Sequence, residues 1–370
     1  MTNSTRWTKS SEPSPFAARL IGRITGCTNP ESAELCLDGE TVVFGNCTMI
    51  IGHPRYTVPP GLVYEESQAF ISQARITSRD SFELVKRELI GNLTSTLAVD
   101  ILRTPTSKFP KGTAFMAVGG RPITKRGANT LVEGAQVRQQ VLAFDPLSGA
   151  ILGRIPLWSG SAIDAKFNAL EQPNGLALDG KGNLYVGDML NGDPDGKLTV
   201  PSAIYRIPHA AIDALVGEKL GAANDVQRIV CPAYVNGITA APDDSVWCVS
   251  CSFNDPEKGA IYQLGDQDFA RGQLPAPRVR ELGILDGVGV TRRGTALASN
   301  PMTGEIFAFT AAGRDHVIRL NGAAVVAQPA DFNVCYPKVL GGEPALLVTD
   351  IAVGRGPGDS EVVLIDISGL

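Results

Sequence analysis

Short apolar runs separated by polar turns fill most of the chain, and three units built from them align without gaps. They are NGLALDGKGNLYVGD, NGITAAPDDSVWCVS and DGVGVTRRGTALASN, which begin at Asn174, Asn236 and Asp286. Each unit has Asn or Asp followed by Gly, a short apolar run, a polar turn and a second apolar run. Runs of this length between turn residues are typical of β-strands, so each unit predicts a hairpin.

The spacing of these hairpins predicts a repeat architecture. Their starts lie roughly 50 to 60 residues apart, and a further strand follows each of them (SAIYRIPH, GAIYQLGD and GEIFAFTA), which suits one four-stranded blade of a β-propeller. Looser copies start at Pro30 and within ADFNVCYPKVLGGEPALLVTD, and TSTLAVDI, TAFMAVGG and QQVLAFDPLSG supply an irregular second blade. The pattern predicts an all-β, six-bladed propeller with four-stranded antiparallel blades around a central channel.

We expect one propeller domain over residues 17–370, after a flexible tail over residues 1–16. The last strand, EVVLIDISGL, is expected to pair with ARLIGRIT near the N-terminus, which closes the ring and removes an exposed sheet edge. The segment IPHAAIDALVGEKL is the best helical candidate and is expected as an insertion between strands.

Composition narrows the function classes. The 370 residues are 44% hydrophobic and include 40 Gly and 25 Pro, as expected for a large core with many turns. The net charge is −5 and no Lys/Arg block stands out, which argues against nucleic acid as a partner. No apolar run reaches the roughly 18–20 residues that span a bilayer, and the polar N-terminus has no secretory apolar region. We therefore expect no membrane partner.

The seven cysteines favour reduced thiols and a cytoplasmic location, because an odd number in a long chain is unlike a disulfide framework. Cys248 and Cys251 form a CxxC pair within SVWCVSCSF. Positions three apart on a strand point to opposite faces, so we interpret the pair as buried strand cysteines rather than a metal or redox site.

Polar residues recur where each innermost strand begins, facing the channel axis. The alignment brings together Glu31, Asn174, Asn236, Asp286 and Asp331, with no member assigned in the second blade. Carboxylates gathered in a narrow channel repel one another, and a bound cation relieves this repulsion. The ligand atoms are all hard oxygens, which favours calcium or magnesium over zinc. Calcium tolerates about 6–8 oxygens in loose geometry, so a ring built from separate blades suits it better than it suits octahedral magnesium. The plainer interpretation is that each Asn-Gly or Asp-Gly pair is only a turn.

These residues carry a family resemblance. The segment QPNGLALDGKGNLYVGD resembles the signature blade of the gluconolactonase and senescence-marker-protein (regucalcin-like) propellers. The order Glu, Asn, Asn, Asp at Glu31, Asn174, Asn236 and Asp286 is similar to the metal shell of diisopropyl fluorophosphatase and paraoxonases. The resemblance implies calcium on these four residues and hydrolysis of a lactone, ester or phosphotriester. The chain departs from it at NPESAEL in the first unit and at Asp331, where the phosphatase relative has a histidine.

We therefore expect a calcium-dependent hydrolase that opens a lactone or related ester of a small molecule, with another divalent cation still open. The cation would polarise the carbonyl while a carboxylate acts as base or nucleophile. Asp286 is the first candidate for that role and Asp331 the second. His53 is a further acid–base candidate, although a solvated loop position is its plainer interpretation.

Loops that follow the second strand of each blade are expected to line the substrate pocket. The residues predicted to contact substrate are Arg55, Tyr56, Asp188, Asn191, Phe253, Asn254, Asn300 and Met302. His209 and His316 are interpreted as structural.

Two other function classes stay open. A metal-dependent lyase or isomerase could use the same scaffold. A non-catalytic binding propeller would instead show an apolar or aromatic upper face and no axial carboxylates. The sequence contains no GxSxG, phosphate-binding or zinc motif, so serine-hydrolase and dehydrogenase chemistry have little support. The oligomeric state cannot be derived from the sequence.

Overall fold

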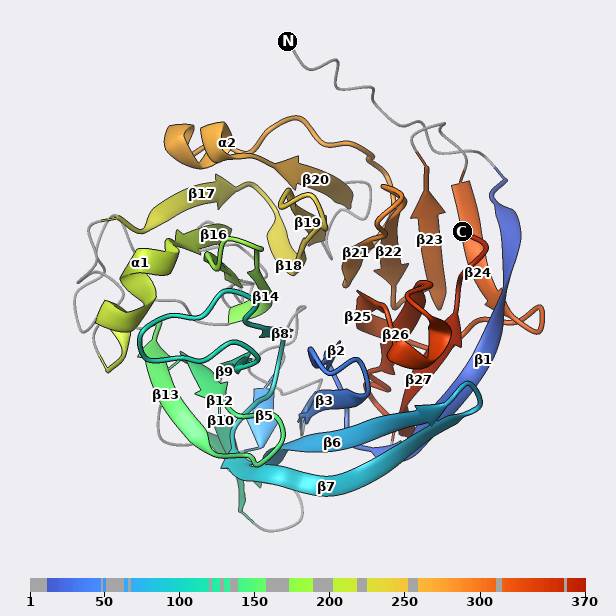
Figure 1. Cartoon of the computed structure of the whole chain (residues 1–370), viewed down its shortest axis with the longest axis horizontal. Coiled ribbons are helices and arrows are strands. Elements are labelled where there is room, and N and C mark those ends of the chain that lie inside the picture. The colour runs from blue at the N-terminus through green and yellow to red at the C-terminus, as the bar shows by residue number, and fades with distance from the viewer. Residues whose placement is uncertain are drawn as a thin grey trace.

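Small antiparallel sheets radiate from a common centre in the computed structural model of this chain (Figure 1). The structure describes residues 12–47, 49–50, 63–65, 68–119, 122–126, 130–133, 139–157, 173–188, 202–217, 225–251, 259–310, 315–355 and 358–370. The prediction of an all-β, propeller-like arrangement is confirmed.

Four of the sheets follow one another along the chain, each beginning with its innermost strand. The first contains β2 (Ala33–Leu35), β3 (Thr41–Asn46), β6 (Ala69–Ser78) and β7 (Ser81–Leu93). The second contains β8 (Val99–Ile101), β9 (Ala114–Val118), β12 (Gln140–Phe144) and β13 (Ile151–Pro156). The third contains β14 (Pro173–Leu178), β15 (Leu184–Asp188), β16 (Ser202–Ile207) and β17 (Gln227–Cys231). The fourth contains β18 (Tyr234–Ala240), β19 (Val246–Cys251) and β20 (Ala260–Leu264).

The last sheet has eight strands in the order β21-β22-β23-β24-β1-β27-β26-β25. Its strands are β21 (Val288–Val290), β22 (Ala296–Asn300), β23 (Glu305–Phe309), β24 (Asp315–Leu320), β1 (Ser14–Cys27), β27 (Ser360–Asp366), β26 (Ala345–Asp350) and β25 (Pro329–Cys335). The antiparallel pairing of β1 with β27 confirms the predicted contact between the chain ends. The parallel pairing of β1 with β24 was not predicted. It is possible because β1 is 14 residues long, begins within the expected tail, and pairs with β24 only through its first five residues.

The remaining elements are short. A separate sheet contains β4 (Met49–Ile50), β5 (Val63–Glu65), β10 (Pro122–Arg126) and β11 (Thr130–Glu133). The predicted helical segment contains α1 (His209–Ile212) and a 3-10 turn (Asp213–Leu215), whereas α2 (Asp266–Arg271) and the 3-10 turn Lys338–Leu340 were not predicted. Among the described residues, no helix has the length and apolar character needed to cross a membrane.

The innermost strands form a closed ring, because each contacts the next in the order β2, β8, β14, β18, β21, β25 and back to β2. Buried apolar clusters fill the space between neighbouring sheets. Between the first two sheets, for example, Val43 and Ile71 pack with Val99 and Met116. All seven cysteines are buried and none forms a disulfide. Cys248 and Cys251 lie on β19, as predicted for strand residues, while the cytoplasmic location stays a prediction.

Candidate functional site at the centre of the ring

The register of the inner hairpins shows which residues occupy equivalent places at the start of the innermost strands. The matching cross-strand pairs are Ala33↔Phe44, Val99↔Met116, Leu176↔Val186, Ile238↔Cys248, Val288↔Ala298 and Phe332↔Val348. We call the residue that lies two positions before the first member of each pair a ring position. The ring positions hold Glu31, Leu97, Asn174, Asn236, Asp286 and Ala330.

The register corrects one predicted position and fills the gap that the alignment left. Glu31, Asn174, Asn236 and Asp286 are equivalent, but the sixth member is Ala330, so Asp331 lies one residue further along. The pairs Pro329↔Asp350 and Phe332↔Val348 match Pro173↔Asp188 and Leu176↔Val186, including the bulge between them. In the second sheet the equivalent residue is Leu97, whose side chain offers no ligand atom.

The glycines that follow the ring residues are required for close approach between neighbouring sheets. A Cβ on Gly237 would lie 2.5 Å from the Asp286 carbonyl oxygen, and one on Gly287 would lie 2.8 Å from Asp331 Cα. A Cβ on Gly175 would lie 2.3 Å from the Asn236 carbonyl oxygen. Neither Gly175 nor Gly237 is in a turn, because both lie inside strands. The plain-turn interpretation of these Asn-Gly pairs is therefore wrong.

Polar side chains at the ring positions form one buried network. Glu31, Asn174, Asn236 and Asp286 are only 4–7% exposed, so bulk water cannot solvate them. Asn174 hydrogen-bonds to the Glu31 carboxyl group and donates through Nδ2 to Asn236 Oδ1. Asn236 in turn hydrogen-bonds to the Asp286 carboxyl group and donates to the Leu285 carbonyl at 3.2 Å. Glu31 Oε2 and Asp286 Oδ1 remain buried without a hydrogen-bond partner.

Burial and mutual repulsion disfavour ionisation of the carboxyl groups. Burial raises the pKa of Glu31 to about 8, and Asp331 adds to the increase. Burial, followed by repulsion from Glu31, raises the pKa of Asp286 well above its usual value. Burial and repulsion from Asp286 raise the pKa of Asp331 to about 8. The three carboxyl groups therefore lie close enough to influence one another.

Asp331 is held firmly although it is not at a ring position. Its Oδ1 accepts a 2.9 Å hydrogen bond from the Phe332 amide, and Ser32 also hydrogen-bonds to the carboxyl group. Its own amide donates to the Glu31 carbonyl at 3.1 Å. Asp331 is partly exposed, unlike the buried Glu31 and Asp286. It is therefore the carboxyl group of the three with the most access to solvent.

The donor set fits a hard divalent cation. Glu31 Oε2 and Asp286 Oδ1 are carboxylate oxygens without partners, and Asn174 and Asn236 lie between them, which is the oxygen chemistry that calcium prefers. The described residues include no group of three or more His, Cys, Asp or Glu side chains that could hold a metal alone. A cation here would therefore depend on the asparagines. Burial raises the pKa of the nearby Cys47 thiol to about 12, which keeps it protonated and a poor ligand.

Described residues that were predicted to contact substrate lie where the second strands end. Asp188 ends β15, and its carbonyl accepts a 2.6 Å hydrogen bond from Ser202. Asn300 ends β22 and holds a turn, because its side chain accepts from the Met302 and Thr303 amides and donates to the Leu282 carbonyl. Met302 is 69% exposed. A role in substrate contact stays a prediction for Asp188, Asn300 and Met302. His53, Arg55, Tyr56, Asn191, Phe253 and Asn254 lie outside the described residues.

A second pair of buried acids, missed by the sequence reasoning, lies three residues beyond two ring positions. Burial raises the pKa of Glu34 and of Asp100, and repulsion between the two adds to the shift of Glu34. Asp100 accepts hydrogen bonds from the Ile101 and Leu178 amides at 2.6 and 2.7 Å. The Arg103 guanidinium offsets part of these shifts. Glu34 and Asp100 each follow a ring position, Glu31 and Leu97, by three residues. This shared spacing could have identified the pair from the sequence if Leu97 had been aligned with the other ring positions.

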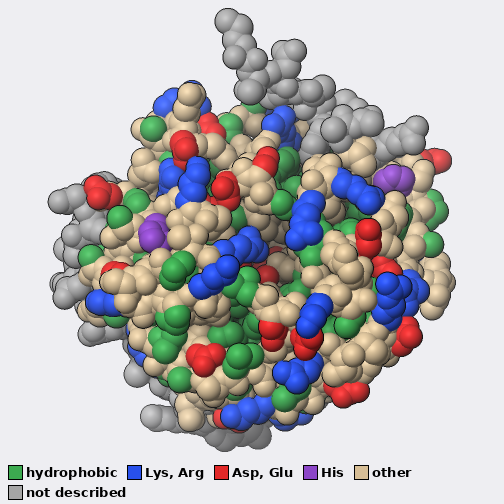
Figure 2. Space-filling view, in the orientation of Figure 1, with side chains coloured by type: hydrophobic (Ala, Val, Ile, Leu, Met, Phe, Trp, Pro, Cys, Tyr) green, Lys and Arg blue, Asp and Glu red, His purple; other side chains and the backbone are tan. Residues whose placement is uncertain are grey.

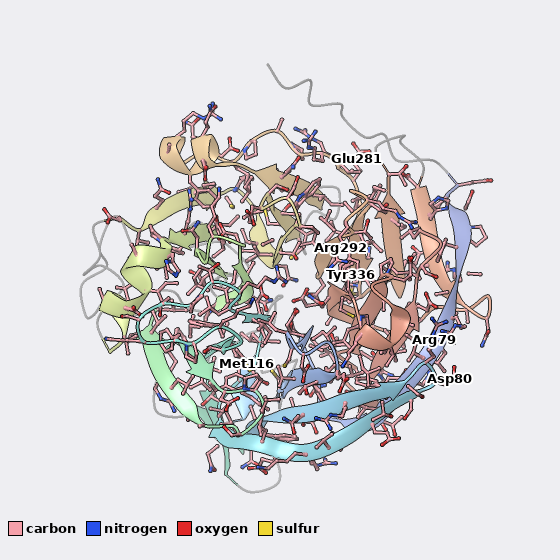
Figure 3. The ribbon with its side chains drawn as sticks, in the orientation of Figure 1. Arg79, Asp80, Met116, Glu281, Arg292 and Tyr336 are labelled. Carbon is pink, nitrogen blue, oxygen red and sulfur yellow. The ribbon has the colours of Figure 1, made fainter. Side chains whose placement is uncertain are left out.

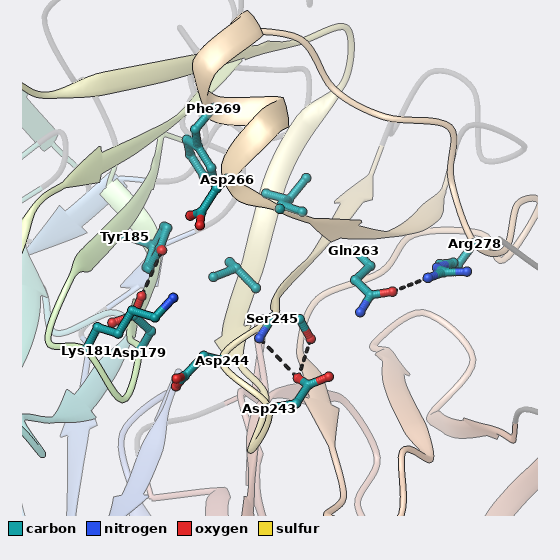
Figure 4. A pocket seen from close by; sticks show the side chains of 13 residues that line it. Asp179, Lys181, Tyr185, Asp243, Asp244, Ser245, Gln263, Asp266, Phe269 and Arg278 are labelled. Atoms are coloured by element: carbon teal, nitrogen blue, oxygen red, sulfur yellow. Dashed lines mark hydrogen bonds between the residues drawn. The ribbon is translucent and has the colours of Figure 1, made fainter. Parts of the chain in front are cut away.

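The turns of the inner hairpins lie at the ends of the innermost strands that are opposite to the ring positions. Lys and Arg side chains gather around the central hollow on the face shown in Figure 2. Arg292 there lies over the Tyr336 ring, with Cζ 3.7 Å from the centroid (Figure 3). A groove of about 380 Å³ is lined by the turns of the third and fourth sheets and by the start of α2 (Figure 4). Asp179, Asp243, Asp244 and Asp266 line it, but the ring residues do not, so the groove is distinct from the site.

Comparison with known proteins identifies the fold. No protein-family model matches the chain, and no sequence among curated proteins matches it. The structure is similar to that of regucalcin, a calcium-binding protein from Agrobacterium tumefaciens, with a TM-score of 0.50 and 11% identity over 96% of this chain and 97% of that one.

Two further structures share the arrangement. A gluconolactonase from Xanthomonas campestris gives a TM-score of 0.51 at 14% identity, covering 96% of this chain and 98% of that one. The PQQ-bound aldose sugar dehydrogenase from Streptomyces coelicolor gives 0.54 at 10% identity, covering 97% and 99%. Because these proteins differ in function, the likeness defines architecture and not chemistry. The chain therefore has the propeller fold of the regucalcin and gluconolactonase structures over nearly its whole length.

Proposed function

We propose that this chain is a six-bladed propeller that holds one calcium ion at its ring positions and hydrolyses a lactone or related ester of a small molecule. The six-blade count treats the eight-stranded sheet as two four-stranded blades, β21–β24 and β25–β27 with β1, joined through β1. The ligands would be Glu31, Asn174, Asn236 and Asp286. The likeness to a gluconolactonase supports the reaction class as fold analogy.

The observation that carries the proposal is the pair of unpartnered carboxylate oxygens, Glu31 Oε2 and Asp286 Oδ1, buried on either side of two asparagines. A buried polar atom without a partner is costly, and a buried unpaired charge is more costly still. A divalent cation would supply the missing partner for both. The axial carboxylates also favour an enzyme over a purely binding propeller.

The proposed mechanism assigns distinct tasks to the three carboxyl groups. A bound calcium ion supplies polarisation of the substrate carbonyl and stabilisation of the oxyanion. Asp331 Oδ2, the oxygen not bonded to the Phe332 amide, would take a proton from water as that water attacks the carbonyl carbon. The acyl C–O bond would then break and the proton would pass to the departing oxygen, which gives a hydroxy acid from a lactone or an acid and an alcohol from an open-chain ester. Asp286, the first candidate from the sequence, becomes the second candidate for this base because it is assigned here as a ligand.

Hydrolysis in ¹⁸O-labelled water tests the reaction class. With a panel of small lactones and esters, we expect calcium-dependent turnover and one labelled oxygen in the product carboxylate, as measured by mass spectrometry. Turnover without label incorporation would instead support the lyase or isomerase alternative. Stoichiometric calcium binding without turnover of any panel member would favour a binding propeller.

The pH dependence of calcium affinity tests the site itself. Because burial raises the pKa of Glu31 to about 8, this carboxyl group is largely protonated at pH 6 in the free protein. Burial also raises the pKa of Asp286 well above its usual value, which favours its protonated form. Calcium must displace these protons, so its affinity should rise steeply between pH 6 and pH 9. Calorimetric titration in buffers of different ionisation enthalpy would measure the released protons. Affinity that is constant over this range, with no proton release, would contradict the assignment.

A further inference from the structure

Two buried hydroxyl groups connect the backbones that carry the three carboxyl groups. Ser299 Oγ accepts from the Gly287 amide, which follows Asp286, and donates to the Ala330 carbonyl, both at 2.7 Å. Thr349 Oγ1 lies 2.7 Å from the Asp331 carbonyl and 2.9 Å from the Glu31 carbonyl, and its hydrogen is shared between them. These bonds form a continuous path from Asp286 through Asp331 to Glu31.

The two hydroxyls occupy equivalent places in the two halves of the eight-stranded sheet. Ser299 precedes the last residue of β22, and Thr349 precedes the last residue of β26. The corresponding residues of the other sheets, which have no side-chain hydroxyl, are Gly45, Ala117, Gly187 and Val249. Of the six equivalent positions, only these two carry a hydroxyl. They lie between the innermost strands whose starts carry Asp286, Asp331 and Glu31.

We infer that Ser299 and Thr349 are positioning residues that set the spacing of the three carboxyl groups and thereby the calcium affinity of the site. This inference rests on the proposed function. Both side chains are fully buried, so water cannot replace the hydrogen bonds that they make. Loss of the Ser299 hydroxyl removes a partner of the Gly287 amide and of the Ala330 carbonyl. Loss of the Thr349 hydroxyl removes a partner of the Asp331 and Glu31 carbonyls. Either loss frees the adjacent strand start to shift. Mutation of residues that hydrogen-bond to a metal ligand and orient it typically lowers metal affinity by about 10- to 100-fold.

The test uses substitutions that remove a hydroxyl with little change in shape. Ser299→Ala and Thr349→Val should each weaken calcium binding about tenfold by calorimetry, and Thr349→Ser should restore it. The matched control is Ser95→Ala. Ser95 is fully buried, donates to the Gly119 carbonyl and accepts from its amide at 2.8 Å. Both residues lie next to the second sheet, whose ring position is Leu97. This control should lose comparable stability but keep its calcium affinity within about twofold.

Amide hydrogen exchange provides a second measurement that does not depend on calcium. In Ser299→Ala the Gly287 amide, and in Thr349→Val the Asp331 amide, should exchange about tenfold faster than in the parent chain. Unchanged exchange, or a calcium affinity matching that of Ser95→Ala, would overturn the positioning role. Failure of the parent chain to bind calcium would instead refute the proposed function. The exchange result would still decide whether the hydroxyls hold these strands.

Discussion

Asp286→Asn and Glu31→Gln are each expected to stabilise the calcium-free protein while weakening calcium binding at least ~100-fold. Both effects have the same physical cause. In the free protein each carboxylate is buried, has an oxygen without a partner and is repelled by another carboxyl group. An amide of the same shape removes the charge that causes this cost, and it also removes the charge that attracts calcium.

The sign of the stability effect follows from the raised pKa values. A carboxyl group whose pKa is higher in the folded state stabilises the fold at low pH, and this contribution is lost as the pH rises through the folded pKa. For Glu31, that interval extends from its usual pKa of 4.5 to about 8. At pH 8 the gain in unfolding free energy for Glu31→Gln should be on the order of 4 kcal/mol. The gain should disappear near pH 5.

Thermal unfolding with and without calcium, at pH 5 and pH 8, measures both effects. The control is Glu83→Gln on the exposed part of β7, which removes the same charge without touching the site. It should change neither calcium affinity nor its pH dependence. If Asp286→Asn and Glu31→Gln destabilised the calcium-free protein at pH 8, their carboxylates would have a structural partner, and the cation proposal would lose its basis.

The ring was predictable from the sequence because its glycines have a steric cause that recurs. Each Asn-Gly or Asp-Gly pair places a polar side chain at a ring position and a residue without Cβ against the next inner strand. The aligned repeat thus identified Asn174, Asn236 and Asp286 together with the glycine that follows each of them. In the sixth unit no glycine follows, so the alignment selected the polar Asp331 instead of Ala330. Only the strand register resolves this one-residue difference.

Other features depend on contacts between distant segments and leave little sequence signal. The hydroxyls of Ser299 and Thr349 become informative only when each is seen to bond to the segment that begins the next innermost strand of the ring. The parallel pairing of β1 with β24 depends on where the N-terminal strand crosses the last sheet. Leu97 interrupts the polar pattern of the ring, so the second sheet could not be aligned by its chemistry. Long-range geometry determines each of these features.

Asp331→Asn is expected to lower kcat about 10²- to 10⁴-fold, the usual contribution of a positioned general base, while calcium affinity changes by less than about fivefold. The amide keeps the oxygen that accepts from the Phe332 amide but cannot take a proton from water. Asp286→Asn should instead lose calcium and turnover together, because Asp286 is assigned as a ligand. The two variants therefore separate proton transfer from cation binding.

Asp179→Asn provides the matched control for this comparison. Asp179 is 2% exposed and accepts hydrogen bonds from Asn183 and Tyr185 at the far end of its hairpin. Its substitution should lower stability and leave kcat unchanged, which distinguishes a catalytic role from the general cost of altering a buried aspartate. If Asp331→Asn kept full turnover while Asp286→Asn lost it with calcium still bound, the base would be Asp286. The partial exposure of Asp331 would then serve only to admit water to the channel.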